Sequence, residues 1–569
     1  MTASEAGRPS PATSSTMAEP GVASAAEPGT RGWRPRPALQ GLLALAIYLV
    51  VFVIGFAFPL LVHLGQPQVG QGGVDPNFYV WSLRWWPYAL SHGLNPLHST
   101  QIGAPGGFDL SWTTTAPALA LVMFPVTAAF GPVTAFNLTL LLSAPVSAWA
   151  AFLAARRLTG RFWASLTAGA IYGFAPYEIG HTSAGQANLV VVMLLPLMVY
   201  LVLLWRDGKL GSRLFTCLLA VTLAAEFYTF NEAFAEMTVL SAVALVLGFV
   251  LCRGEQRRTV ARLARLAAVA WVAAVVLAAP YQLYALHHYQ AGFTKAIPAN
   301  SLNLSYIVDF PSSIPLLLIV LALVVITWSS RLTRVLFIVL VLVAALALGP
   351  RLAAGSHQFG ALPWGPLWSL PFAKSAEPAR LMLFGYLVLA MFVALWLALP
   401  GRNRLLLAGR WLVAAVAVAT LLAYEPPPAP MGSIPAGVAS AAVPPADALP
   451  SFISSGRYRD YLRPGEIVVV VSDRGNAGML FQADTDFYFR IAGGFINAAL
   501  TDPTALPGPV EQLMQPSPAA EQQFRRYVRQ AGIGAILVEQ AWSAPWMRVF
   551  SRMGLRGTSV GGMIVYPTG

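Results

Sequence analysis

Acidic and histidine side chains, which can bind and release protons, gather between the long apolar segments of this chain or at one set of their ends. A charge next to hydrocarbon is costly, so a cluster of such acids indicates a water-filled cavity with a function. Proton transfer is the chemistry that these side chains supply. The set comprises Asp75, Asp109, Glu178, Glu226, Glu232, Glu236, Asp309, Glu377 and Glu425, with His63, His92, His98, His181, His287, His288 and His357.

Asp75 belongs to the most unusual stretch, a loop of about 65–112 that follows the first apolar run. It directly precedes Pro76, which indicates the start of a helix, where a carboxylate is favoured. The following segment, 77–90, is dense in aromatic residues and is typical of a helix lying in the membrane interface. Simple capping of that helix is the alternative role for Asp75.

The elements that must position these groups are transmembrane helices. Of the 569 residues, 56% are hydrophobic and only 11% are charged, whereas soluble domains average about 25% charged residues. The first apolar run, about 39–64, can span a bilayer and follows three arginines, so we predict an uncleaved helix with its N-terminus inside. With this run, about eleven spans are predicted, the others at 133–155, 163–178, 187–205, 213–230, 233–252, 266–285, 314–329, 335–349, 379–400 and 407–424.

The positive charges support this topology. Sixteen arginines and lysines fall in the connections predicted to be cytoplasmic, and the outer loops hold only Arg84, Lys295, Arg351, Lys374 and Arg380. The net charge of +12 is therefore scattered, and we expect no nucleic-acid partner. Residues 113–131 are short and contain two prolines; a re-entrant or surface helix is favoured there, with a true span as the alternative.

Four regions follow from this reading. Residues 1–36 are predicted to be a disordered cytoplasmic N-terminus, and 37–424 an α-helical polytopic membrane domain whose first outer loop is 65–132. Residues 425–450 are dense in proline and alanine and indicate a linker. Residues 451–569, with apolar runs at 466–471, 533–538 and 562–566 and a helical pattern at 521–532, predict a small mixed α/β domain. An odd number of spans places this domain outside the plasma membrane.

Several motifs resemble the GT-C membrane glycosyltransferases. They are the acid just after the first span, the interfacial helix in that loop, the small-residue span ending in ARRLTGR (155–161) and the next span closing as GFAPYE (173–178). In motif detail the resemblance covers about 37–205, and elsewhere it is one of topology. The phrase GMLFQADTDFYFRIAGGF (478–495) resembles the outer domains of multispanning actinobacterial proteins.

This resemblance implies sugar transfer from a polyprenyl-phosphate donor to a cell-envelope glycan or lipid acceptor on the outer leaflet, with inversion. It gives the role of general base to Asp75, and cationic groups then stabilise the leaving lipid phosphate. No cofactor is expected and, because the first loop has no DxD-like pair, no metal. The donor phosphate is assigned to Lys374, Arg380, His287 and His288, and the substrate to Asp109, Glu178, His181, Arg84 and Trp85. The alternatives are a boundary role in the membrane for Lys374 and Arg380, and for Glu178 a side chain facing water.

Two other classes of protein remain open. A secondary transporter or flippase of an envelope precursor would show internal repeats and acids near the membrane midplane, but no convincing repeat occurs and the acids lie toward one side. A non-catalytic envelope-assembly protein derived from a GT-C ancestor would have the same sequence features. The long aromatic loop and the outer domain favour the transferase.

Overall fold

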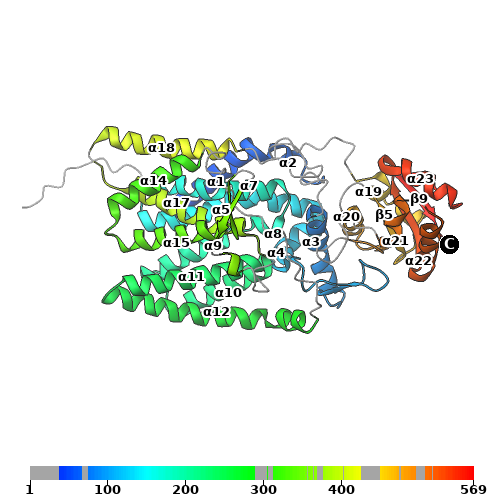
Figure 1. The fold of residues 1–569 in the computed structure, drawn as a ribbon, viewed down its shortest axis with the longest axis horizontal. Helices are drawn as coiled ribbons and strands as arrows, with labels where there is room; N and C mark the ends of the chain where they lie inside the picture. Colours follow the sequence, from blue (N-terminus) through cyan, green and yellow to red (C-terminus); the bar gives the residue numbers. More distant parts are fainter. Residues whose placement is uncertain are drawn as a thin grey trace, which may run out of the picture.

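The computed structural model describes residues 37–66, 75–288, 304, 312–354, 357–362, 364–367, 376–401, 403–424, 449–472, 476–494, 507–515 and 517–568. The N-terminal region 1–36 and Lys374 lie outside these residues, as does nearly all of the predicted linker. A bundle of long helices forms one end of the molecule and a small α/β domain forms the other, with helix α3 (Asp75–Ser91) between them (Figure 1).

Among the described residues, seven helical stretches are long and apolar enough to cross a membrane: 37–62, 132–159, 187–206, 231–251, 255–287, 378–398 and 404–422. Each corresponds to a predicted span. The other four predicted spans coincide with α6 (Phe162–Gly173) and α7 (Pro176–Ser183) together, α10 (Ser212–Thr229), α14 (Ser313–Thr327) and α15 (Arg331–Ala347), which fall outside that set. The segment 113–131 forms a short apolar helix, α4 (Pro117–Phe130). Eleven spans therefore stay a prediction.

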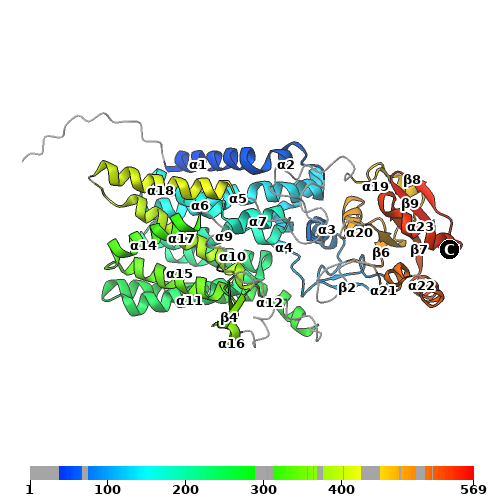
Figure 2. The ribbon, with the colours of Figure 1, turned by 45° about the horizontal axis from the view of Figure 1, so that its top comes forward.

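Burial divides the bundle into an inner and an outer layer. The hydrophobic stretches of α5 (Pro132–Thr159) and of α17 (Met382–Ala398) with its preceding turn are 72% and 67% buried. Those of α12 (Glu255–His287) and α18 (Arg404–Leu422) are each only 17% buried. Apolar side chains on the outer helices face away from the protein, as expected for helices that contact lipid. Figure 2 shows α1 (Pro37–Phe52) and α18 along one side of the bundle.

Glycine allows α5 and α6 to pack closely. A Cβ atom added at Gly173 would lie 2.5 Å from the carbonyl oxygen of Ala144, and one at Gly169 would lie 2.5 Å from that of Ala148. Small residues at such positions let helix backbones approach in a membrane. This contact fixes α6, and through it the short helices α7 and α8 (Ala187–Val190) that follow.

Helix α3 differs from the interfacial helix predicted for 77–90. Its aromatic side chains do not lie against a membrane surface; Trp81 is 0% exposed and Trp85 is 1% exposed, because both the bundle and the C-terminal domain cover them. A two-stranded ribbon, β1 (His98–Ser99) with β2 (Phe108–Asp109), leads from α3 to α4.

The C-terminal domain is built on a five-stranded sheet with strand order β6-β5-β7-β9-β8. The strands are β5 (Ile467–Val471), β6 (Arg490–Ile491), β7 (Ile533–Glu539), β8 (Thr558–Val560) and β9 (Met563–Pro567). Strands β6, β5 and β7 are parallel, and β9 is antiparallel to β7 and β8. The connecting helices are α20 (Ala477–Asp484), α21 (Gly508–Glu511), α22 (Pro518–Ala531) and α23 (Ser543–Arg552), and α19 (Ser451–Ser454) precedes the sheet.

The first outer loop completes this sheet. The amides of Gly103 and Ala104 donate to the carbonyls of Gly493 and Ile491, and the amide of Ile491 donates to Gln101, at 2.8–3.0 Å. Backbone of residues 101–104 thus pairs with the outer side of β6, which would otherwise be a free sheet edge. Buried Gln482 reinforces the junction by donating to the Gln101 carbonyl and accepting from the Trp81 indole. The C-terminal domain is therefore docked on the loop that carries Asp75.

Candidate functional site

Asp75 is the first residue of α3 and lies inside the protein. Its Oδ2 accepts a hydrogen bond from Nε2 of Gln186 at 2.8 Å. Burial raises the pKa of Asp75 above its ordinary value, and the Gln186 hydrogen bond and the positive charge of Arg380 offset part of that rise. Asp75 is therefore a partly desolvated carboxylate, with more affinity for a proton than one on the surface.

Glycine brings the segment between α7 and α8 against the start of α3. Gly185 has φ +69°, in the left-handed region, and a Cβ atom there would lie 2.8 Å from Cγ of Pro76. The next residue, Gln186, can then reach Asp75. One turn along α3, the Tyr79 hydroxyl donates to Oδ1 of Asn188 and lies 3.4 Å from Oγ1 of Thr114. The N-terminus of α3 is thus attached to two separate segments of the membrane domain.

His181, on α7, contacts Gln186. Its Nδ1 lies 2.5 Å from Oε1 of Gln186. Burial lowers the pKa of His181 to about 4, so the imidazole is neutral near pH 7. Because an amide oxygen can only accept, we assign the proton of the neutral ring to Nδ1.

Arg380 lies in the turn Pro378–Leu381, before α17, and is paired with two carboxylates. It contacts Glu232, at the start of α11 (Asn231–Leu251), at 2.6 Å and Glu377 at 3.0 Å. Its side chain is 17% exposed, and the alternative role as an arginine at the membrane boundary stays open. The Arg380 Nε is buried and has no hydrogen-bond partner among the described residues. One donor of this guanidinium is therefore available to a ligand.

The structure gives Arg84 and Trp85 contacts within the protein. Arg84 forms an ion pair with Asp486 of the C-terminal domain, in which its Nη2 and Nε both donate to Oδ1, at 2.8 and 3.0 Å. The buried indole of Trp85 donates to the carbonyl of Pro96. Both residues stabilise the contact between the first loop and the C-terminal domain. The sequence had instead predicted substrate contacts for them.

Asp109 is placed away from Asp75. It caps its own turn by accepting from the amide and hydroxyl of Ser111, at 2.8 and 2.5 Å. The ribbon that carries Asp109 begins just after Pro96, which contacts Trp85. Trp85 follows Asp75 by ten residues on α3, about 15 Å along the helix axis. The structure therefore does not bring the two acids of the first loop together.

The remaining predicted residues have varied surroundings. Glu178, on α7, is 1% exposed, so its alternative role as a residue facing water is wrong. His287 and His288 are exposed at the end of α12, where the ring of His288 stacks on Tyr284. Lys374 is not among the described residues.

Sequence reasoning missed Gln186, Tyr79 and Asn188, and it named Glu232 and Glu377 only as members of the acidic set, without a contact to Arg380. Gln186 closes the segment PYEIGHTSAGQ, in which only Glu178 and His181 had been considered. The glycine directly before it was the available signal for a tight turn. Nothing local indicates that this turn meets a helix 111 residues earlier in the chain.

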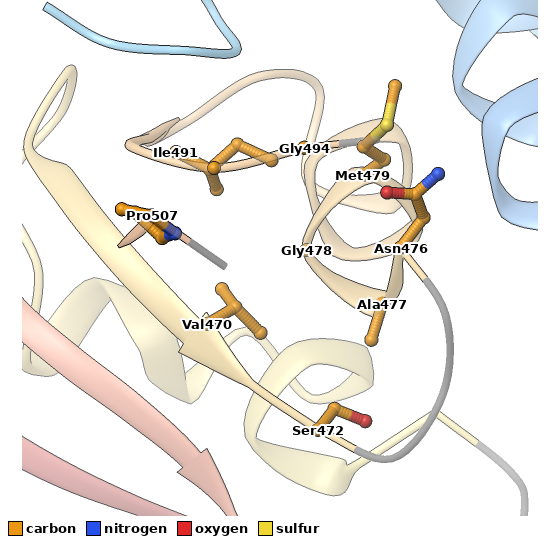
Figure 3. Close-up of a pocket in the computed structure, with 10 residues that line it drawn as sticks. Val470, Ser472, Asn476, Ala477, Gly478, Met479, Ile491, Gly494 and Pro507 are labelled. Atoms are coloured by element: carbon orange, nitrogen blue, oxygen red, sulfur yellow. The ribbon is translucent and has the colours of Figure 1, made fainter. Parts of the chain in front are cut away.

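Two pockets lie outside this group. One is in the C-terminal domain, where the ends of β5 and β6 meet the start of α20; Figure 3 shows Val470, Ser472, Ile491 and Gly494 around it, with Asn476 and Gly478. The other lies beside the Asp75 site, between Thr113–Pro117, the turn between α10 and α11, and Tyr281. Thr114 in its wall contacts Tyr79, so this second pocket adjoins α3.

Comparisons with known proteins show the fold. No protein-family model matches the chain, and no curated protein matches it in sequence. Its structure is similar to the arabinofuranosyltransferase AftD from Mycobacteria (TM-score 0.56, 15% identity, 94% of this chain and 40% of AftD). It is also similar to ArnT from Cupriavidus metallidurans bound to undecaprenyl phosphate (TM-score 0.53, 11% identity, 93% of this chain and 98% of ArnT).

A third similarity is to the archaeal oligosaccharyltransferase AglB from Archaeoglobus fulgidus, in complex with an inhibitory peptide and a dolichol-phosphate (TM-score 0.52, 12% identity, 93% of this chain and 74% of AglB). The chain spans two fifths of the length of AftD. At these identities the likeness concerns the fold, and the expected GT-C fold is confirmed.

Proposed function

We propose that the protein is a GT-C glycosyltransferase that moves a sugar from a polyprenyl-phosphate donor to a glycan or lipid of the cell envelope, on the outer side of the membrane. The observation that carries the proposal is the environment of Asp75. This half-buried carboxylate is held by one amide hydrogen bond, close enough to the half-buried Arg380 for that charge to affect its pKa. The site therefore combines Asp75, which can accept a proton from an acceptor hydroxyl, with Arg380, which can bind the donor phosphate.

In the proposed reaction, the acceptor hydroxyl oxygen attacks the anomeric carbon while Asp75 takes its proton. The new carbon–oxygen bond forms as the bond from the anomeric carbon to the donor phosphate breaks, with inversion at that carbon. The bond's electron pair leaves with the polyprenyl phosphate. The raised pKa of Asp75 suits this role, because a base is most effective when its pKa approaches the working pH.

Arg380 is proposed to stabilise the leaving phosphate. Its Nε is a guanidinium donor that neither Glu232 nor Glu377 engages, and donors to charged oxygens make the stronger hydrogen bonds. The two carboxylates hold the guanidinium in place before the donor arrives, so it needs little reorganisation during the reaction. Lys374, His287 and His288 are proposed as further phosphate contacts, and Glu178 and Asp109 as substrate contacts. Two structural neighbours are bound to undecaprenyl phosphate and to a dolichol-phosphate, which supports the choice of donor class.

The test compares wild type, Asp75→Asn and Asp460→Asn in isolated membranes supplied with a panel of labelled polyprenyl-phosphate sugars. Asp460 is an exposed acid of the C-terminal domain and serves as the matched control. Asp75→Asn should lower transfer about 10²–10⁴-fold with normal expression, and Asp460→Asn should match wild type. An Asp75→Asn protein that is well expressed and fully active would rule out the proposed base.

A flippase is the second candidate, and two buried glutamates favour it. Glu226 and Glu236 are on α10 and α11, and the carboxylates of both lack a hydrogen-bond partner among the described residues. Such groups in membrane helices often carry protons. Both lie within two turns of the connection between their helices, toward the Asp75 site, rather than at mid-helix. If wild type consumes no donor but moves a lipid-linked sugar across vesicles, the flippase replaces the transferase.

A further inference from the structure

The side chain of Gln186 bridges Asp75 and His181. Its Nε2 donates to Oδ2 of Asp75 at 2.8 Å, and its Oε1 faces Nδ1 of His181 at 2.5 Å. Both ends of one amide are thus engaged, on one side with the proposed base and on the other with a buried ring. Neither contact follows from helix packing, since Gln186 lies between α7 and α8.

We propose that Gln186 is a positioning residue for Asp75, which it holds in the orientation that faces the acceptor hydroxyl, and that His181 fixes the direction of the Gln186 amide. This inference rests on the proposed function, because it takes Asp75 to be the base. In this inference His181 acts on Asp75 only through Gln186, whereas the sequence predicted a direct contact of His181 with the substrate.

The direction of the amide depends on the histidine tautomer. A glutamine side chain has two donors on nitrogen and acceptors only on oxygen. With a proton on Nδ1 of His181, the amide oxygen must face the ring and the amide nitrogen must face the carboxylate. With Nδ1 unprotonated, the amide would turn and place its oxygen against Asp75. A neutral Nδ1–H ring therefore selects the orientation that stabilises the ionised base.

The backbone around Gln186 is fixed independently of these contacts. Its amide donates to the carbonyl of His181 at 3.1 Å, and its carbonyl accepts from the amide of Leu189 at 2.9 Å. Gly185 presses the same turn onto Pro76. A substitution that removes the polar atoms of the Gln186 side chain should therefore leave the turn in place.

Other charged and titratable groups around Asp75 must be separated from this effect. They are Tyr79 on α3 itself, Tyr177, Glu178 and His181 on α7, Glu377 and Arg380 before α17, and Glu232 on α11. Helix α4 contributes none, α20 contributes Asp484, and the titratable groups of α5 are the arginines of its last turn. Gln186 has no charge of its own. Its replacement by an apolar residue therefore removes the hydrogen bonds to Asp75 and His181 and leaves the net charge of the site unchanged.

The test measures sugar transfer against pH for the full-length protein and its variants, with whichever labelled polyprenyl-phosphate sugar the wild type consumes. Wild type should lose activity as pH falls through the pKa of Asp75. Gln186→Met removes a bond to the ionised form, so this pKa rises and the acid limb moves up by about 1 pH unit. On that limb the rate is then about tenfold below wild type at the same pH.

Two substitutions of His181 provide a matched pair. His181→Leu removes the ring donor and should move the acid limb in the same direction as Gln186→Met. His181→Asn retains an N–H near the position of Nδ1 and should keep the midpoint of wild type. This pair carries the test if Gln186→Met is poorly expressed.

Each outcome has a separate meaning. A uniform loss of rate at every pH, with the midpoint unmoved in both Gln186→Met and His181→Leu, would leave Gln186 as a structural residue only and overturn the inference. Activity and an unchanged acid limb in Asp75→Asn would instead overturn the proposed base. The inference is supported when Asp75→Asn is inactive and the midpoint moves upward in Gln186→Met and His181→Leu but not in His181→Asn.

Discussion

Phe487 should contribute most of the docking between the C-terminal domain and the first outer loop. It is 5% exposed, and its ring centroid lies 5.8, 5.6 and 4.6 Å from those of Trp81, Trp85 and Tyr88 on α3. Truncation of a buried phenylalanine to alanine costs about 3–5 kcal/mol. The nearby Arg84–Asp486 pair is 25% and 57% exposed at its two side chains, so its loss should cost less than about 1 kcal/mol. Apolar contact should therefore outweigh the ion pair.

Hydrogen exchange measures this difference directly, because the amides of Gly103, Ala104 and Ile491 are bonded across the junction. In Phe487→Ala their protection should fall by about two to four powers of ten, whereas Arg84→Ala should lower it less than about tenfold. The amide of Ile536, within the sheet, serves as the internal control and should keep its protection in both variants. Equal losses in the two variants, or a larger loss in Arg84→Ala, would refute the assignment of the docking energy to Phe487.

Two further predictions concern the membrane domain. Gly173→Ala should lower thermal stability and expression, because its methyl group would meet the Ala144 carbonyl oxygen at 2.5 Å, whereas Gly180→Ala, with no atom within 4 Å, should behave like wild type; equal behaviour of the two would contradict the close packing of α5 and α6. Reporter fusions after Gly160, Gly211, Gly254 and Gly401 should report from the cytoplasm, and those after Gly292 and Gly432 from outside; a cytoplasmic signal after Gly432 would overturn the predicted side of the C-terminal domain.

The sequence indicates the helices better than the contacts between them. Long apolar runs identify the seven stretches that could cross a membrane, because their hydropathy is local. Asp75 is recognisable beside Pro76, but its partner Gln186 comes 111 residues later, in a turn whose only sign is a glycine. Arg380 looks like a single boundary arginine until Glu232, 148 residues earlier, is placed beside it. These pairings join segments that are far apart in the chain and have no local pattern.

The aromatic residues of α3 illustrate the same limit in another way. The apolar surface of tryptophan side chains on a helix can be buried either in a membrane interface or beneath another domain. The residue whose ring packs edge-on against both Trp81 and Trp85 is Phe487, some 400 positions away in the chain. The composition of α3 predicted a helix lying in the membrane interface, whereas its aromatic side chains are buried inside the protein.

The pairing of residues 101–104 with β6 has a consequence for biosynthesis. Arg490, which donates to the Thr100 carbonyl, follows it by 390 residues. At about 5–20 residues per second, the ribosome needs about 20–80 s to reach β6 after completing the loop strand. During that interval the helices from α4 to α18 are made while the loop has unpaired backbone groups. The C-terminal domain, which is made after the bundle, therefore completes the first loop, and chains that terminate before it would leave this strand open to aggregation and to quality-control proteases.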